Sequence, residues 1–398
     1  MQRVSPIEVS PHDPDRVYYG TQYVMVTEDG GVTWRRLSDD LTATPPGTQG
    51  ISGEPITRDI TGEEVYSTLY AIEESPVEPG VIWVGSYDGP FHVSTDNGAS
   101  WTEITPPDLP PGGRVQSIDP SPHHGGTAIY SVMRFMLDDW GPYAYRTRDY
   151  GQSWELLTDG RNGIPADYPV RVVREDPVRP GLLYAGTEFA LYASFDDGAH
   201  WQPLQLDLPA VPVTDMAFAP GAAAWAGDAA AADEAGAGPA ARHAGGDLAI
   251  STMGRGFHVL RDLTPLRALD DEAAGAPFTL HDPAPAVLSE WRTWGGESPV
   301  SPEYGEPGAV VDWVLAEAPQ AVTVELLDVD GAVVNGWTSS GDGYALATRA
   351  GMRGDETARP GHPRTPRRPA AYRRAGRGVR RGPRVRARGR PRGAARAD

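Results

Sequence analysis

Short segments rich in β-branched and aromatic residues, with alternating apolar and polar positions, recur along residues 1–262. Such alternation over a few residues is typical of half-buried β-strands. Before each of these strands comes another that ends in a Pro-containing turn. The pattern predicts antiparallel meanders. The strand segments are VYYGTQ from Val17, VIWVGSYDG from Val81, AIYSVM from Ala128 and LLYAGTE from Leu182, and the segments before them are IEVSPHDPDR, IEESPVEPG, IDPSPHHGG and VREDPVRPG.

A motif of the form Ser/Thr-x-Asp-x-Gly-x-(Thr/Ser/His)-Trp follows these strands four times. Its Asp residues lie 67, 53 and 47 positions apart, which is the size of one four-stranded propeller blade with variable loops. Each repeat therefore reads as strand, Pro turn, strand, strand, Asp-box turn, strand. The box residues are Asp29, Gly31 and Trp34; Asp96, Gly98 and Trp101; Asp149, Gly151 and Trp154; and Asp196, Gly198 and Trp201.

Turn chemistry accounts for the box residues. The Asp is expected to accept backbone N–H bonds across the turn, the Gly to take a positive φ, and the Trp to pack between neighbouring strands. The alternative is calcium held by pairs such as Asp196 and Asp197. That pair lacks the dense oxygen-ligand loop that a hard cation needs, so we predict a structural role, no metal and no cofactor.

A fifth repeat has lost its box and carries a long insertion. It consists of VTDMAFAP from Val213 and DLAISTMGRGFHVLRD from Asp247. Residues 219–246 between them contain 14 Ala and 6 Gly, which bury too little surface to offset the entropy of ordering. We expect a flexible insertion there, within a five-repeat propeller at 1–262 whose ring is incomplete.

The pattern changes beyond residue 262. Residues 263–304 read as a Pro-rich linker, and residues 305–348 contain alternating strands joined at Asp330-Gly331, a hairpin signal. They resemble the opening of a β-sandwich, which needs about seven strands, so we expect a truncated one. Overall the sequence predicts an all-β chain.

Charge is divided very unevenly along the chain. The formal net charge is −19, yet residues 349–398 hold 17 Arg against three acidic residues. This tail has no periodic pattern of apolar residues and is predicted to be disordered. Two explanations are open: a shifted reading frame, or a basic arm that binds nucleic acid. The acidic remainder argues against nucleic acid and membrane partners and favours a monomer. The start of the chain shows no signal peptide, which leaves localisation open.

The boxes, the YxGT strands, the loop SGEPITRDITGEEVY from Ser52 and MGRGFHVLRDLTPL resemble the Asp-box (bacterial neuraminidase repeat) β-propellers. The resemblance is closest to the sortilin-type propeller proteins of bacteria that are often labelled glycosyl hydrolases, and it covers roughly residues 5–345. It implies a secreted or periplasmic protein of which this chain looks like an internal fragment.

Acidic residues on the first strands of the repeats are candidates for the wall of a central channel: Glu8, Glu73, Asp119, Glu175 and Asp215. They either form a solvated wall of little energetic weight or supply paired carboxylates for glycosyl transfer. Arg174 and Arg255 are candidate ligand contacts, with surface ion pairing as the alternative. We therefore take Glu73, Asp119, Arg174, Asp215 and Arg255 as the candidate ligand-binding residues.

Two classes of function follow from these residues. The first is a non-enzymatic module that binds an extracellular protein or glycan. The second is a glycoside hydrolase with carboxylate catalysis. A sialidase would need three arginines for the substrate carboxylate, and no such triad can be assigned in this sequence.

Overall fold

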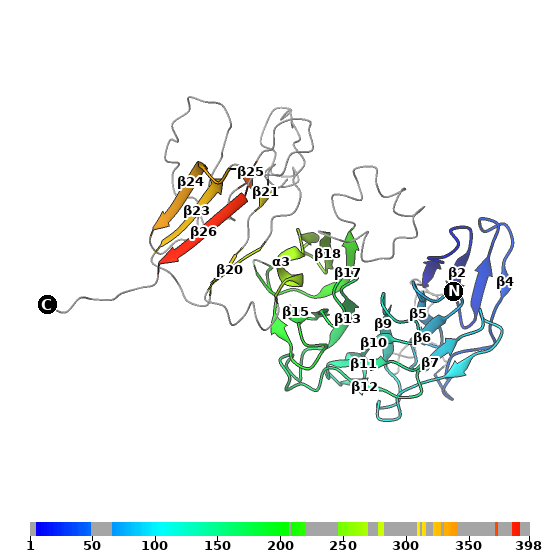
Figure 1. The fold of residues 1–398 in the computed structure, drawn as a ribbon. Coiled ribbons are helices and arrows are strands. Elements are labelled where there is room, and N and C mark those ends of the chain that lie inside the picture. The colour runs from blue at the N-terminus through cyan, green and yellow to red at the C-terminus, as the bar shows by residue number, and fades with distance from the viewer. Residues whose placement is uncertain are drawn as a thin grey trace, which may run out of the picture. The chain divides into compact units, whose positions relative to one another are not determined.

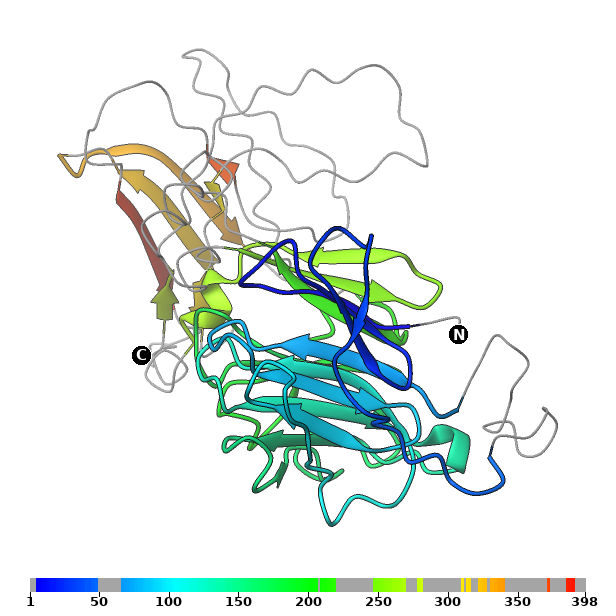
Figure 2. The same ribbon diagram turned by 90° about the vertical axis from the view of Figure 1, so that its right-hand side faces the viewer.

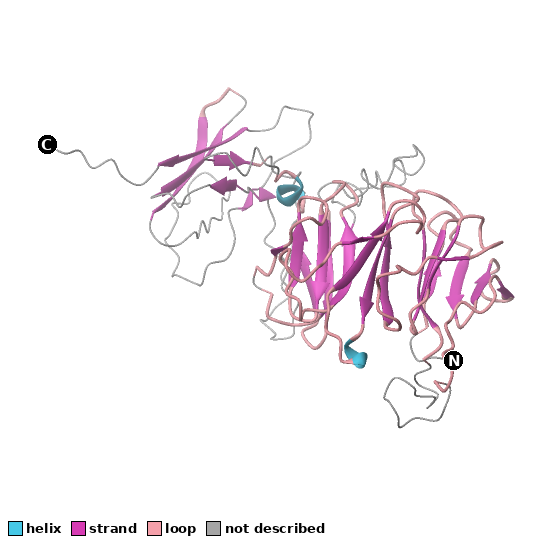
Figure 3. Ribbon diagram, turned by 90° about the horizontal axis from the view of Figure 1, so that it is seen from below, coloured by secondary structure: helices cyan, strands magenta, loops and turns pink. Residues whose placement is uncertain are grey.

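The computed structural model describes residues 5–48, 66–206, 208–219, 246–269, 278–281, 309–310, 313–315, 321–327, 330–340, 371–372 and 384–390. Strands dominate these residues, and the helical elements among them are two short turns, η2 (Phe135–Leu137) and α3 (Thr264–Arg267), as Figure 3 shows. No helix of the described part is long and apolar enough to cross a membrane. The described residues up to 219, together with 247–261, form one compact unit, and those from 262 onward belong to a second.

Five antiparallel sheets that resemble propeller blades make up the first unit, and Figure 1 shows them following one another round an arc. The strands of each sheet pair in sequence order. Sheet 1 contains β1 (Ile7–Val9), β2 (Val17–Gly20), β3 (Val24–Thr27) and β4 (Arg35–Arg36); sheet 2 contains β5 (Leu69–Glu74), β6 (Ile82–Ser86), β7 (Phe91–Ser94) and β8 (Thr102–Glu103); sheet 3 contains β9 (Arg114–Pro120), β10 (Ala128–Met133), β11 (Tyr143–Thr147) and β12 (Glu155–Leu156); sheet 4 contains β13 (Val170–Glu175), β14 (Leu183–Thr187), β15 (Leu191–Ser194) and β16 (Gln202–Pro203); and sheet 5 contains β17 (Val213–Ala219), β18 (Asp247–Thr252) and β19 (Phe257–Leu260).

The core lies between successive sheets rather than inside any one of them. Val24 and Val26 of sheet 1, for example, are buried in one cluster with Leu69 and Ile72 of sheet 2. The first strands of successive sheets also pack against one another, β1 on β5, β5 on β9, β9 on β13 and β13 on β17. The sheets therefore stand side by side with their first strands innermost, as the labels of Figure 1 show, and Figure 2 shows the same sheets turned by 90°.

Each Asp box closes the turn between the third and fourth strands of its sheet. Asp149 accepts hydrogen bonds from the Ser153 N–H (2.8 Å), the Ser153 hydroxyl (2.6 Å) and the Thr147 hydroxyl (2.9 Å). Gly151 has a φ of +84°, and an added Cβ there would lie 2.5 Å from Ile104 of the preceding sheet. Asp29, Asp96 and Asp196 accept the corresponding bonds, and Gly31, Gly98 and Gly198 share the positive φ.

The box tryptophans reach further than the sequence suggests, because three of them bond to the preceding sheet. The indole N–H of Trp154 donates to the carbonyl of Ile104 at 2.7 Å, and Trp101 and Trp201 donate likewise to Leu37 and Leu157. Trp34 of sheet 1 instead donates to its own turn, at the Gly31 carbonyl. The boxes of sheets 2 to 4 thus close their own turns and also bond their sheet to the preceding one.

Short strands beyond residue 262 form separate small sheets. In the described part, β20 (Phe278–Leu280) pairs with β22 (Trp313–Leu315), and β21 (Ala309–Val310) pairs with β25 (Ala371–Tyr372). β23 (Ala321–Leu327) lies between β24 (Val333–Ser340) and β26 (Arg384–Arg390). Asp330-Gly331 falls between β23 and β24, where the sequence predicts a hairpin.

Several predicted segments fall wholly or largely outside the described residues. They are most of the insertion at 219–246, most of the linker at 263–304, the loop from Ser52, and the Arg-rich tail at 349–398 apart from β25 and β26. The truncated sandwich, the disordered tail and its two alternative explanations therefore stay predictions.

Candidate functional site

The first strands of sheets 1 to 4 each carry an acidic residue or an arginine at the same register position. Glu8 pairs across its sheet with Tyr18, Glu73 with Trp83, Asp119 with Ile129 and Arg174 with Tyr184. These four cross-strand partners are all buried. Because the first strands are innermost, the four residues converge, and Asp215 of β17 joins them from sheet 5 through a hydrogen bond to Arg174. We call Glu8, Glu73, Asp119, Arg174 and Asp215 the axial cluster.

Arg174 links sheets 3, 4 and 5 within this cluster. Its guanidinium donates to Asp119 Oδ1 (3.3 Å), to Asp215 Oδ1 (3.0 Å), and to the carbonyls of Ile118 (2.7 Å) and Met216 (3.2 Å). Burial lowers the pKa of Arg174, but the attraction of Asp119, Asp215 and Glu73 outweighs burial and raises it above its usual value. The arginine is therefore fully charged, and much of its donor capacity is used within the protein.

Burial disfavours the ionised forms of the carboxyl groups around Arg174. Burial, with repulsion from Glu8, raises the pKa of Glu73 to about 8 against the opposing effect of Arg174. Burial likewise raises the pKa of Glu8 to about 7 and that of Asp119 to about 6. Within the described part of the chain no group donates a hydrogen bond to Glu8 or Glu73. Burial therefore favours the protonated forms of these three carboxyl groups, and both alternatives, a solvated wall and paired catalytic carboxylates, stay predictions.

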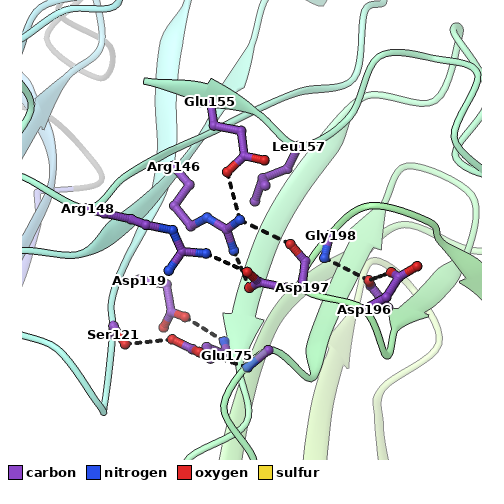
Figure 4. A network of polar contacts seen from close by, with 12 residues as sticks. Asp119, Ser121, Arg146, Arg148, Glu155, Leu157, Glu175, Asp196, Asp197 and Gly198 are labelled. Carbon is purple, nitrogen blue, oxygen red and sulfur yellow. Dashed lines mark hydrogen bonds and ion pairs between the residues drawn. The ribbon is translucent and has the colours of Figure 1, made fainter. Parts of the chain in front are cut away.

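Glu175 does not belong to the channel wall, contrary to the sequence-based expectation. Its carboxylate accepts hydrogen bonds from the Ser121 hydroxyl (2.6 Å) and the Gly181 N–H (3.2 Å), as Figure 4 shows for Ser121. Neighbouring residues of a strand point to opposite faces, so the residue after Arg174 faces sheet 3 instead of the axis. Glu74 of sheet 2 has the same role, since it accepts the Tyr18 hydroxyl at 3.1 Å.

Arg255 lies apart from the other candidates. It sits in the exposed turn between β18 and β19, flanked by Gly254 and Gly256 with positive φ. The structure therefore brings together Glu73, Asp119, Arg174 and Asp215, while Arg255 stays on the surface. Whether any of the five contacts a ligand stays a prediction.

Asp196 and Asp197 are the residues considered as calcium ligands. In the structure their carboxylates accept hydrogen bonds from neighbouring side chains and backbone groups. Asp197 accepts from Arg146 and Arg148, both at 2.5 Å, and Arg146 also reaches Glu155 at 2.7 Å (Figure 4). Asp196 accepts from His200 and Ser194. Among the described residues, no group of three or more His, Cys, Asp or Glu side chains is arranged to hold a metal ion.

A second cluster, which the sequence analysis did not identify, lies toward the other end of sheets 2 and 3. The Arg114 guanidinium stacks over Tyr70 (4.7 Å), Tyr87 (5.3 Å) and Phe135 (5.9 Å). Trp140, which contacts Phe135, is 46% exposed. We call these five residues the loop-end cluster. A signal was present in the segment RFMLDDWGP from Arg134, an aromatic insertion where the other repeats have short turns.

Arg114 differs from Arg174 in its electrostatic surroundings. Arg174 faces two carboxylates within 3.3 Å, whereas Arg114 forms no ion pair with any described residue. Its positive charge is met by aromatic faces, whose quadrupoles attract cations. The loop-end cluster therefore surrounds one positive charge with aromatic rings, of which Trp140 is exposed and Tyr87 is buried.

No protein-family model matches the chain, and no curated protein matches it either. Among solved structures, a GH74 xyloglucanase from Xanthomonas campestris is 17% identical, with a TM-score of 0.42 over 65% of this chain and 36% of that one. YCF48 from Cyanidioschyzon merolae is 16% identical, with a TM-score of 0.35 over 52% of this chain and 61% of that one. The extracellular domain of a one-component system from B. thetaiotaomicron is 11% identical, with a TM-score of 0.37 over 62% of this chain and 26% of that one. The chain spans about a third of the xyloglucanase, and what these proteins share with it is an arrangement of β-sheets, so the comparisons leave its function open.

Proposed function

We propose that this chain is a non-enzymatic Asp-box β-propeller module, of the sortilin-like kind, that binds a protein or glycan through its loop-end cluster. In this proposal the axial cluster joins the sheets instead of contacting the ligand. Arg174 supports this structural role of the axial cluster, because its guanidinium donates to two carboxylates and two carbonyls of neighbouring sheets.

The observation that carries the proposal is the separation of the axial carboxyl groups from the aromatic rings of the loop-end cluster. Arg114 and Asp119 lie at opposite ends of β9, five residues apart, which is roughly 16 Å of extended strand. A glycosidase needs two carboxyl groups about 5–10 Å apart beside the surface that holds the sugar. The axial carboxyl groups lie at the other end of β9 from the sugar-stacking rings, and Asp139, which does lie beside the rings, is paired with Arg134 at 2.7 Å. This arrangement favours binding over hydrolysis.

The loop-end cluster has the chemistry of a contact surface. Trp140 and Leu137 are 46% and 39% exposed, and Phe135 and Met136 lie beside them in η2. Large aromatic rings contribute most to binding because they bury much area at little entropic cost. Such rings suit either the flat face of a sugar or the apolar side chain of a protein.

A glycan array and a peptide array, probed with the purified chain, test this proposal. Trp140→Ala should lower binding to any positive spot at least tenfold, as expected for loss of an aromatic anchor. Trp34→Ala is a matched control, because Trp34 is similarly exposed at 43% but lies on sheet 1. Binding that survives Trp140→Ala, or arrays without a positive spot, would overturn the proposal.

The second candidate, a glycoside hydrolase, is favoured by one observation. Burial raises the pKa of Glu73 to about 8, so a protonated carboxyl lies in one cluster with Asp215, which is 62% exposed. A protonated acid beside an ionised carboxylate is the pairing that glycosyl transfer uses. Turnover of chromogenic glycosides that disappears in both Glu73→Gln and Asp215→Asn would replace the binding proposal with this one.

A further inference from the structure

Arg114 of the loop-end cluster differs from the other arginines that the first unit removes from water. It is half-buried, yet it forms no ion pair with a described residue, and its one hydrogen bond within that part of the chain goes to the sulfur of Met133 at 3.9 Å. Burying a guanidinium costs free energy unless a partner compensates its charge. Five other buried or half-buried arginines of this unit each lie within 3.3 Å of a carboxylate oxygen: Arg16, Arg134, Arg146, Arg171 and Arg174.

β-bulges place two of the side chains near Arg114. In the first strands of sheets 2 to 5, the pairing with the second strand skips one residue, and a bulge of this kind redirects a side chain and is common next to active sites. The bulged residue of β5, Tyr70, is the ring that stacks on Arg114 at 4.7 Å. The bulged residue of β9 lies two positions after Arg114. The four skipped residues occupy equivalent positions and are Tyr70, Gln116, Arg171 and Thr214.

Two polar atoms of β9 are buried at this place without a hydrogen-bond partner among the described residues. They are Nε of Arg114 and Oε1 of Gln116. The first is a donor and the second is an acceptor. Native proteins leave few buried polar atoms unbonded, so each such atom calls for an explanation, for example a bound ion or water. A positive charge, a donor and an acceptor together match an anionic group that has a hydroxyl beside it.

Two ion pairs at the same end of sheets 3 and 4 are complete by themselves. Arg171 contacts Glu188 at 2.5 Å, and Asp139, which lies beside the aromatic rings, contacts Arg134 at 2.7 Å. Arg114 is therefore a single positive charge on a chain whose net charge is −19. A single guanidinium matches one carboxylate, whereas the net charge of the chain repels a polyanion at long range.

We propose that the loop-end cluster binds an acidic sugar, namely a glycan that carries isolated carboxylates, such as glucuronic acid, on a neutral backbone. This inference rests on the proposed binding function and names its ligand class. The aromatic rings lie over the guanidinium of Arg114 at 4.7–5.9 Å, so its N–H edge is left to donate to the carboxylate of the sugar. The Trp140 ring stacks on the apolar face of a sugar residue, and Gln116 accepts a hydrogen bond from a hydroxyl.

Calorimetric titration of the full chain with matched oligosaccharides tests the inference. The probes are xylo- and galacto-oligosaccharides that each carry one glucuronic acid, and the methyl esters of the same compounds, in which the carboxylate is neutral. About 0.15 M salt, where the Debye length is about 8 Å, keeps long-range repulsion small. At least one acid should bind about tenfold more tightly than its ester, as expected for a charged hydrogen bond. Oligogalacturonate, with a carboxylate on every residue, should bind more weakly than that acid.

Variants of two arginines assign the preference for the acid to one side chain. Arg114→Gln should lower the affinity for the acid to that for the ester and change the affinity for the ester less than about threefold. Arg114→Lys keeps the charge without the planar fork, so it should keep part of the preference. Arg148→Gln is the matched control, because Arg148 is an exposed arginine of the same sheet that pairs with Asp197, and both of its affinities should equal those of the parent.

The outcomes separate this inference from the proposed function. A parent that binds acid and ester equally overturns the inference, and a carboxylate elsewhere in the chain that neutralised Arg114 would give this same result. A preference that persists in Arg114→Gln, or tighter binding of oligogalacturonate, also overturns it. Such results leave the binding function standing if Trp140→Ala abolishes the binding, whereas a parent that binds no glycan and no peptide overturns both. The comparison of acid with ester in the parent needs no variant, and circular dichroism checks that Arg114→Gln is folded.

Discussion

The carboxyl groups of the Asp boxes and those of the axial cluster are the same chemical groups in opposite circumstances. Asp149 lies near the surface, yet hydrogen bonds from Ser153 and Thr147 lower its pKa below the usual value. Glu73 lies in the axial cluster, where no described residue donates a hydrogen bond to it, and burial raises its pKa to about 8. Burial and the surrounding donors together, more than the residue type, decide whether the pKa of a carboxyl group is lowered or raised. Asp119 accepts hydrogen bonds from Arg174 and the Glu175 N–H, yet burial raises its pKa to about 6.

This difference has opposite consequences along the pH scale. A lowered folded pKa gives stability that is present above the unfolded pKa and is lost as pH falls through the folded value. A raised folded pKa gives stability that is present below the unfolded pKa and is lost as pH rises through the folded value. The boxes therefore favour neutral and alkaline pH, and the axial cluster favours acidic pH.

Trp154→Ala should have the largest effect on stability, because it removes the link between a box and the preceding sheet. The indole packs on Phe91 and Tyr130 and donates to Ile104. Truncation should lower the free energy of unfolding by about 3–5 kcal/mol. Denaturant unfolding measures it, with Trp34→Ala as the matched control: Trp34 bonds only to its own turn and should lose clearly less. Equal losses would show that the box tryptophans do not act between sheets.

Asp149→Ala should have the next largest effect, since it leaves the Ser153 N–H and hydroxyl and the Thr147 hydroxyl without their acceptor. These donors are partly exposed, so water recovers some of the loss, and we expect about 1–3 kcal/mol. Thermal melts read alongside the binding arrays decide the role of the box. A variant that melts like the parent but no longer binds would contradict a structural role.

Glu73→Gln should act in the opposite direction once the pH is high enough. In the parent, stability falls from about pH 4.5 to pH 8, because the unfolded chain releases the Glu73 proton first. The amide cannot ionise, so at pH 8 the variant should be more stable than the parent by on the order of 1 kcal/mol. Melting temperatures at pH 5 and pH 8 test this, and a parallel pH dependence of the two proteins would refute a buried, protonated Glu73.

Asp215→Asn should have the smallest effect. Its carboxylate pairs with Arg174 but is 62% exposed, and exposed ion pairs contribute little. The change in unfolding free energy should stay within about 0.5 kcal/mol at pH 7. A loss of unfolding free energy as large as that of Asp149→Ala would mean that Asp215 is the main carboxylate that compensates the charge of Arg174.

The elements of the five sheets were readable from the sequence because their signals are local. Runs of β-branched and aromatic residues located β6 and β14, although both strands are buried at every position and not half-buried as their pattern predicted. The box motif located the turns around Asp96 and Asp149, since a turn is held by donors within four residues of its Asp. The sequence also placed acidic residues on the first strands, but it grouped Glu175 with Glu8, Glu73 and Asp119, whereas the structure has Arg174 at that register position.

Only the tertiary structure decided what these residues meet. Asp119 and Asp215 surround Arg174 from other sheets, Glu175 turns away to Ser121, and Arg114 lies under rings of β5, the turn after β6 and η2. The burial of Ile72 and the exposure of Ile7 likewise differ although both occupy the same position of one repeat. Partners distant in sequence and removal from water are properties of the packed sheets, and they set the pKa values and the exposure of side chains, which the repeat pattern alone does not contain.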